Sequence, residues 1–263
     1  MIEDMTTRVH PKAIVEPGAQ LSDGVEVGAY AYVGGSVVIG TNCCIHHHGI
    51  VQGKTILGEE NEIFPFAFIG GKTQDLKFRD GNPPLCIGNR NVFREYVSVH
   101  CATSENTTTI IGNDNYILAY AHIAHECVLQ DHIIVSSQVV LGGHVQIDSF
   151  ANIGGSSAIH QFCRVGMHAM LGGGSALVQD IPPFMIAEGN RARVRAYNKV
   201  GLERHGFSVS EIEQVRHLFR LIHETILPIG EVLEVIRDDA RIDEKIKEPF
   251  LRFYGNNVRG ISR

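Results

Sequence analysis

Histidines that could transfer protons gather in three short strings of the chain. The strings are AHIAHEC (121–127), LGGHV (141–145) and IHQFC (159–163). An imidazole ionises near neutral pH, so a well-placed histidine can act as a general base. His125, Gly143 and Gln161 follow one another at equal intervals in the sequence. This spacing gains chemical meaning only if the fold places positions separated by that interval side by side.

A six-residue repeat predicts a fold of that kind. An aliphatic residue stands at every sixth position from 9 to 69, from 87 to 99 and from 111 to 177, with Phe93 as the one aromatic member. The residue two positions earlier is often small or β-branched, and in a strand it shares the face of the aliphatic residue. Glycine often follows the aliphatic residue, as a bend requires. Each hexad therefore predicts a very short strand and a corner, and the fixed period predicts stacked coils.

Two segments interrupt the repeat. The first is rich in glycine, proline and charge and predicts a loop near residues 70–86, and the second is rich in threonine and predicts a loop at residues 103–110. Loops on a rigid scaffold often carry binding residues, although tolerance of an insertion would explain them equally well.

After Leu177 the hexads stop, and from about Arg191 the pattern turns helical. Ser210 and Glu213 have the spacing of a capping box, and further helices are expected around residues 230–237 and 244–254. We therefore expect two units. Residues 1–186 form the β-helix, and residues 187–263 form a small α-helical domain that covers its open end.

Composition favours an enzyme that works in the cytoplasm. The formal net charge of −6 gives no case for nucleic acid as a partner. No apolar run reaches membrane-spanning length, and no signal-peptide pattern is present. The six cysteines lack metal-type spacing, and three of them (Cys43, Cys127 and Cys163) stand at inward positions of the repeat, where they would fill the core.

The hexads resemble those of known hexapeptide-repeat proteins, and this resemblance implies a left-handed parallel β-helix with three hexads in each coil. One coil then equals the interval between His125, Gly143 and Gln161, so these residues form one column on three successive coils. Glu126 then lies one coil from His144, and His160 lies one coil from Gly142.

An ordered set of strings gives a more specific resemblance that covers nearly the whole chain. They are QDLKF (74–78), AHIAHEC (121–127), GGHV (142–145), HQFCRVG (160–166), QDIPPF (179–184), GLERHGFS (201–208) and RGISR (259–263). The set resembles the UDP-N-acetylglucosamine O-acyltransferases of lipid A biosynthesis. The resemblance implies transfer of a 3-hydroxyacyl chain from acyl carrier protein to the glucosamine 3-hydroxyl of UDP-N-acetylglucosamine. It implies no metal and no cofactor, because the phosphopantetheine thioester of the carrier is a substrate.

The resemblance also implies roles for individual residues. His125 matches the general base, and the N–H of Gly143 can donate to the developing oxyanion. Glu126 stands where the family usually has aspartate, which puts its role in orienting His125 in doubt. The positions implied to bind substrate are Asp75, Lys77, His122, His144, His160, Gln161, Asn198 and Arg204. Val200 replaces a glutamate of some members, so that contact would be absent.

Three further implications concern the acyl chain and the partners. Gly173 matches a position in the acyl-chain pocket, and a small residue there favours a longer chain. Arg191, Arg193 and Arg195 are a candidate docking surface for the acidic acyl carrier protein, although a solvated helix face would explain them as well. The family forms homotrimers with sites between subunits.

Several alternatives stay open. The related N-acyltransferase of the same pathway usually has an extra N-terminal domain, whereas here the hexads start at Val9. An acyltransferase for a 3-amino UDP-sugar would be hard to distinguish. A zinc β-helix lyase resembling a carbonic anhydrase could use His122 and His125 as ligands, but Ile117 occupies the position that would supply another histidine. A scaffold without catalytic activity is the last alternative.

Overall fold

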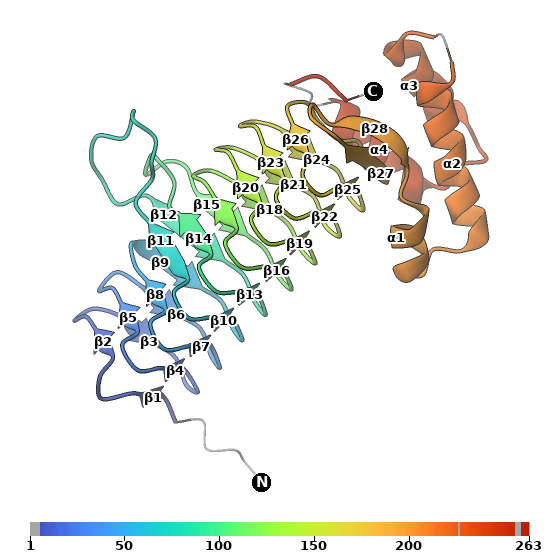
Figure 1. The fold of residues 1–263 in the computed structure, drawn as a ribbon. Helices are drawn as coiled ribbons and strands as arrows, with labels where there is room; N and C mark the ends of the chain where they lie inside the picture. Colours follow the sequence, from blue (N-terminus) through green and yellow to red (C-terminus); the bar gives the residue numbers. More distant parts are fainter. Residues whose placement is uncertain (1–5, 226, 256–258, 263) are drawn as a thin grey trace.

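The computed structural model describes residues 6–225, 227–255 and 259–262, and most of this chain winds into a parallel β-helix with three flat faces (Figure 1). Face A consists of β1 (Arg8–Val9), β4 (Glu26–Val27), β7 (Cys44–Ile45), β10 (Glu62–Ile63), β13 (Val92–Phe93), β16 (Tyr116–Ile117), β19 (Ile134–Val135), β22 (Asn152–Ile153), β25 (Met170–Leu171), β27 (Met185–Glu188) and β28 (Arg193–Tyr197). Face B consists of β2 (Ile14–Val15), β5 (Tyr32–Val33), β8 (Ile50–Val51), β11 (Phe68–Gly71), β14 (Ser98–His100), β17 (His122–Ile123), β20 (Val140–Leu141), β23 (Ala158–Ile159) and β26 (Ala176–Leu177). Face C consists of β3 (Gln20–Leu21), β6 (Val38–Ile39), β9 (Lys54–Leu57), β12 (Pro84–Ile87), β15 (Thr109–Ile111), β18 (Val128–Leu129), β21 (Gln146–Ile147) and β24 (Arg164–Val165).

The strand register confirms that each regular coil consists of three hexads. His122 pairs with Val140 and Val140 with Ala158, and the strands are parallel. From Val27 onward the aliphatic positions of the repeat point inward and pack into one continuous core, in which Phe93 is fully buried. Cys43, Cys127 and Cys163 are also fully buried and free, as their inward positions predict.

A column of buried asparagines crosses this core where face C turns into face A. The side chain of Asn91 donates to Asn61 Oδ1 at 2.9 Å, and that of Asn115 donates to Asn91 Oδ1 at 2.9 Å. Asn91 and Asn115 also donate to backbone carbonyls of the next coil. Their polar groups are therefore paired inside the core, which removes the penalty of burying them.

Both insertions leave the β-helix at the same corner, where face B turns into face C. The first spans residues 72–83 between β11 and β12, where the expected bounds were 70–86, and the second spans residues 101–108 between β14 and β15, where they were 103–110. The first is the loop that projects from the coils in Figure 1. The turn after β17, which holds His125, lies at this corner on the following coil.

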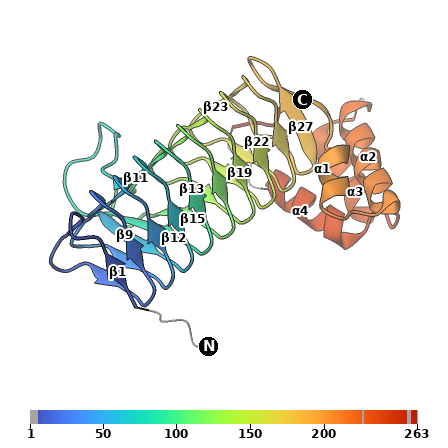
Figure 2. The ribbon, with the colours of Figure 1, turned by 60° about the horizontal axis from the view of Figure 1, so that its bottom comes forward.

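The chain after the hexads forms a hairpin before it forms helices, so the prediction of helix from Arg191 is wrong for the first residues. β27 and β28 pair antiparallel at the end of face A. Residues 191–195 alternate between exposed arginines and buried Ala192 and Val194, which is the period of a strand rather than of a helix. The helices that follow are α1 (Lys199–Arg204), α2 (Val209–His223), α3 (Ile229–Asp238) and α4 (Glu244–Gly255). Figure 2 shows them at the end of the β-helix.

The predicted capping box of α2 is misplaced by two residues. Ser208 is the N-cap. Its hydroxyl oxygen accepts a hydrogen bond from Glu211 N, and the Glu211 carboxylate accepts one from Ser208 N. The sequence SVSEIE fits the motif twice. The actual frame places Phe207 and Ile212 in the same apolar cluster, which is the arrangement of a hydrophobic staple. In the alternative frame Val209 would have to make the staple contact, but its side chain is 81% exposed.

No described helix combines the length and the apolar character that crossing a membrane requires.

Candidate active site

The column predicted from the three-hexad spacing exists at the corner between faces B and C. His144 N donates to His125 O at 3.0 Å, and Phe162 N donates to Gly143 O at 3.1 Å. A Cβ added to Gly143 would lie 2.5 Å from His125 Cε1 and 2.6 Å from Nε2. Gly143 therefore lies directly over the imidazole, and any residue with a Cβ at this position would clash with the ring.

Glu126 contacts His125 directly, despite its extra methylene relative to aspartate. Its carboxylate oxygen Oε2 is hydrogen-bonded to His125 Nδ1. The side chain of Glu126 is 7% exposed and that of His125 is 14% exposed. Because Nδ1 faces the carboxylate, Nε2 is the ring nitrogen left to accept a proton.

The second insertion supplies further partners to this carboxylate. Thr103 N donates to Glu126 Oε1 at 2.6 Å, and Thr107 Oγ1 lies 2.7 Å from the same oxygen. Burial would raise the pKa of Glu126, but the hydrogen bonds from Thr103, Thr107 and His125 outweigh it and leave the pKa lowered. Glu126 is therefore ionised at neutral pH. Sequence reasoning assigned no role to either threonine, although the threonine-rich composition of the loop was visible.

Two more histidines border the pair, His122 on the same coil and His144 on the coil above. The ring of His144 lies perpendicular to that of His125, with centroids 5.4 Å apart, and His144 Nε2 lies 3.9 Å from Glu126 Oε2. His122 Nδ1 lies 2.8 Å from Ser98 Oγ. Burial lowers the pKa of both His122 and His144, so both are mainly neutral at pH 7 and can donate or accept hydrogen bonds.

The first insertion also lies near this corner, because the charges of Asp75 and Lys77 act on His144. Asp75 is half-buried and its Oδ1 accepts from Lys77 N at 2.9 Å, whereas the Lys77 side chain is exposed. His160 and Gln161 are exposed on the coil above. The structure thus gathers six predicted site residues around His125 and Gly143: Asp75, Lys77, His122, His144, His160 and Gln161.

Two predicted substrate residues lie elsewhere in the same chain. Asn198 caps α1 through Gly201 N at 3.1 Å, and its Nδ2 donates to His168 O at 2.8 Å. His168 follows β24, at the corner between faces C and A. Arg204 is the exposed last residue of α1, and Val200 of that helix is also exposed. These residues therefore sit at a different corner from His125.

The remaining predicted positions are also away from the column. Gly173 follows β25, so it lies at the corner between faces A and B, at the other end of face B from His125. Arg193 and Arg195 are exposed on β28, with Arg191 just before the strand. All three are solvent-exposed, as the alternative interpretation expects, but Arg193 and Arg195 lie on a strand and not on a helix face.

The side chains around Glu126 include a group whose atoms could act as metal ligands. Within the described residues, His125, Glu126 and His144 are the one group of three whose ligand atoms all lie within 4.8 Å of one another. Zinc accepts such ligands. However, both oxygens of Glu126 already accept hydrogen bonds from His125 and from the threonine loop. In this structure the Glu126 carboxylate is therefore engaged by hydrogen-bond donors.

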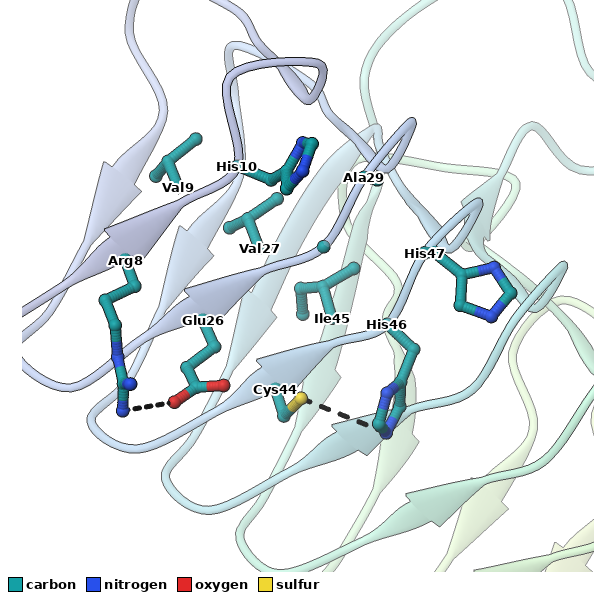
Figure 3. A pocket seen from close by; sticks show the side chains of 11 residues that line it. Arg8, Val9, His10, Glu26, Val27, Ala29, Cys44, Ile45, His46 and His47 are labelled. Atoms are coloured by element: carbon teal, nitrogen blue, oxygen red, sulfur yellow. Dashed lines mark hydrogen bonds and ion pairs between the residues drawn. The ribbon is translucent and has the colours of Figure 1, made fainter.

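A hollow on the N-terminal coils lacks this chemistry. It encloses about 490 Å³ on face A, and Figure 3 shows its lining. Its charged groups pair with each other, as Arg8 does with Glu26 at 2.6 Å, and burial raises the pKa of Cys44 to about 11. The thiol therefore stays protonated, and this hollow offers no activated nucleophile.

A candidate base at the corner of a β-helix built from hexads is typical of the hexapeptide-repeat acyltransferases. Comparisons with known proteins specify the class further. Residues 180–262 match the family model described as UDP N-acetylglucosamine O-acyltransferase, domain 2. The chain is 45% identical over 262 residues to the acyl-(acyl-carrier-protein)–UDP-N-acetylglucosamine O-acyltransferase of Burkholderia lata, covering 98% of this chain and all of the relative. It is 40% identical over 258 residues to the protein of that name from Syntrophobacter fumaroxidans, covering 97% of this chain and all of the relative.

Solved structures agree. The UDP-N-acetylglucosamine acyltransferase of Francisella novicida superposes with a TM-score of 0.93 at 31% identity, covering 97% of this chain and 94% of that one. The Acinetobacter baumannii enzyme superposes with a TM-score of 0.91 at 35% identity, covering 97% of this chain and 99% of that one. The chain belongs to the UDP-N-acetylglucosamine O-acyltransferase family and is an acyltransferase. The family and the left-handed parallel β-helix predicted from the sequence are confirmed.

Proposed function

We propose that the chain transfers a 3-hydroxyacyl group from acyl carrier protein to the 3-hydroxyl of UDP-N-acetylglucosamine, the first step of lipid A biosynthesis, with His125 as the general base. The observation that carries this proposal is the contact of His125 Nδ1 with the buried, ionised Glu126. It orients the ring so that Nε2 faces outward beneath Gly143.

The reaction needs no acyl-enzyme. His125 Nε2 takes the proton of the sugar hydroxyl while its oxygen attacks the thioester carbonyl. The N–H of Gly143 donates to the oxyanion that develops on the carbonyl oxygen. When the C–S bond breaks, the imidazolium returns its proton to the leaving phosphopantetheine thiolate, and the ester remains on the sugar. Neutral His122 and His144, with His160 and Gln161 above them, are placed to bind the sugar, and Asp75 and Lys77 reach over it.

An acyl-transfer assay tests the proposal. The purified chain is given UDP-N-acetylglucosamine with carrier proteins bearing 3-hydroxyacyl chains of several lengths, and the product is detected by mass spectrometry. Absence of product with every chain length would reject it. A parallel series with a 3-amino UDP-sugar decides between oxygen and nitrogen as the acceptor atom.

We also propose a homotrimer in which a second subunit completes the site. Asn198 and Arg204 match positions that the family resemblance assigns to nucleotide binding, yet within one chain they lie at a different corner from His125. A second copy, related by a threefold axis along the β-helix, can bring the two sets together. Mixing His125→Ala and Arg204→Ala chains during refolding tests this arrangement. Recovered activity supports a shared site, and no recovery argues against it.

The partner side of the proposal concerns the exposed arginines of the β28 region. Arg191, Arg193 and Arg195 form a basic surface on a chain with a net charge of −6, which suits docking of the acidic carrier protein in the cytoplasm. Replacing all three with glutamine should raise KM for the acyl carrier protein but not for the nucleotide sugar. The absence of a side chain at Gly173 supports a long acyl groove. An unchanged chain-length preference in Gly173→Leu would refute that role.

A further inference from the structure

The loop at residues 101–108 has no role in the function described so far, yet it supplies three hydrogen bonds to the carboxylate of Glu126. It leaves the β-helix at the corner that carries His125, one coil below it. Thr103 N donates to Oε1 at 2.6 Å, and Thr107 Oγ1 donates to the same oxygen at 2.7 Å. Thr103 Oγ1 lies 3.2 Å from Oε2. The loop therefore engages both carboxylate oxygens, and Oε2 also faces His125.

The direction of these hydrogen bonds can be assigned. Thr107 Oγ1 also lies 2.9 Å from Ser104 O, but a hydroxyl has one proton, and the closer, charged carboxylate is the stronger acceptor. Thr103 Oγ1 lies 3.2 Å from Thr73 Oγ1 of the first insertion. If Thr73 donates to Thr103, the proton of Thr103 is available for Glu126. Asp75 N in turn donates to Thr73 Oγ1 at 3.1 Å.

A glutamate needs this support more than a shorter acid would. Its side chain has one more rotatable bond than aspartate, and each freely rotating bond weakens the hold of a carboxylate on its partner. The backbone at Glu126 is itself fixed, because its N–H donates to Thr109 Oγ1 at 2.9 Å. The threonine loop fixes the other end of the side chain.

We propose that Thr103 and Thr107 are positioning residues, which hold the Glu126 carboxylate in the one orientation that keeps His125 Nε2 directed at the substrate. The inference rests on the proposed role of His125 as the base. The hydroxyls act on the reaction only through Glu126, and the chain Asp75–Thr73–Thr103–Glu126–His125 links the first insertion to the base.

Other titratable groups also face this pair. His144 lies over Glu126 from the coil above, and His100 and His122 lie beside His125 on β14 and β17. Asp75 and Lys77 act on His144 from the first insertion. All five remain in the variants described next, so a difference between the variants and the wild type reports on the threonines.

Thr107→Val tests the proposal, because it removes the hydroxyl, keeps the shape and changes a side chain at the surface. We expect kcat to fall about tenfold, as for loss of one hydrogen bond to a charged group, with KM for UDP-N-acetylglucosamine unchanged. With one donor fewer, the Glu126 carboxylate becomes more basic and stabilises the protonated imidazole of His125 more strongly. The acid limb of kcat/KM should therefore move to higher pH. Thr107→Ser, which keeps the hydroxyl, should restore both values, and Thr103→Val should behave like Thr107→Val.

Thr108→Val is the matched control, since it changes the neighbouring threonine, whose side chain is not a donor to Glu126, and it should match the wild type in kcat and pH profile. If Thr107→Val keeps the kcat and acid limb of the wild type, the inference is wrong. If its kcat falls but the acid limb stays, the loop is merely structural and the inference is also wrong. A fully active His125→Ala would instead reject the base and the inference together.

Discussion

Two corners of the β-helix carry columns of histidine, and their chemistry differs. At the corner between faces C and A, the rings of His132, Phe150 and His168 stack nearly parallel, with centroids 4.8 and 4.7 Å apart. At the corner between faces B and C, the rings of His125 and His144 are perpendicular, with a carboxylate beside them. We call these the stacked column and, after its proposed role, the catalytic column.

The backbone does not explain the difference. His132, Phe150 and His168 of the stacked column have φ values of 57°, 63° and 53°, and Glu126 and His144 of the catalytic column have 53° and 61°. The same turn is therefore repeated at both corners. In the stacked column each ring covers the next. In the catalytic column Gly143 lies one coil above His125, so no side chain stacks on the His125 ring. A repeat decides where side chains stack, and the residue on the next coil decides what they can do.

Replacing one histidine from each column should give the largest contrast. His125→Ala removes the base, and acyl transfer should fall by about 10²–10⁴-fold, which is the usual contribution of general base catalysis. His132→Ala removes a ring of the stacked column that is half exposed, and the rate should stay within about twofold of the wild type. Steady-state rates measured at saturating substrate compare the two. Equal losses would mean that the columns do not differ in function.

Gly143→Ala should give the next largest effect, because it closes the space over the ring of His125. The new Cβ would lie 2.5 Å from Cε1, so the imidazole must move, and a displacement of about 1 Å can cost roughly 100-fold in rate. Gly230→Ala is the control, since a Cβ at that helix position meets nothing within 4 Å. A Gly143→Ala enzyme with the activity of the wild type would show that the ring is not held by its neighbours.

Converting His144 into a member of a stacked column is a milder test. Its ring already lies 4.6 Å from Phe162 in a stacked arrangement, so His144→Phe should fold normally. It removes one proposed polar partner of the sugar, and kcat/KM for UDP-N-acetylglucosamine should fall about tenfold. The melting temperature measures folding in the same sample. Unchanged kinetics would place the sugar away from His144.

The columns themselves could be predicted from sequence because every hexad fixes its own register. An aliphatic residue that slipped by one position would leave the core, so Ile123, Leu141 and Ile159 fix the coils that hold His125, Gly143 and Gln161. The periodic signal ends where the insertions begin. Nothing in the spacing of Thr103 and Thr107 relates them to Glu126, since their loop has no repeat and its path depends on contacts with the corner itself.

The tail shows the same limit on a smaller scale. Helix α2 was expected, but two overlapping motifs could cap it, and the burial of Phe207 and Ile212 decides between them. The hairpin of β27 and β28 was missed, because the alternation of arginine with Ala192 and Val194 is only one strand long. In both cases packing against the end of the β-helix selects among local patterns that the sequence permits equally.

His168→Phe should have the smallest effect, and on stability rather than rate. Burial lowers the pKa of His168 to about 4 in the folded chain, whereas an unfolded histidine ionises near 6.5. The unfolded chain therefore takes up the proton first as the pH falls, so stability is lost between about pH 6.5 and pH 4. Phenylalanine would continue the stack with Phe150 and Phe184 and cannot be protonated. We expect the loss in unfolding free energy between these pH values to shrink by on the order of 2 kcal/mol. Urea unfolding at both pH values measures it, and His132→Phe, at the exposed end of the same column, serves as the control. An equal acid loss in His168→Phe and the wild type would mean that the stacked column can accommodate a charged ring.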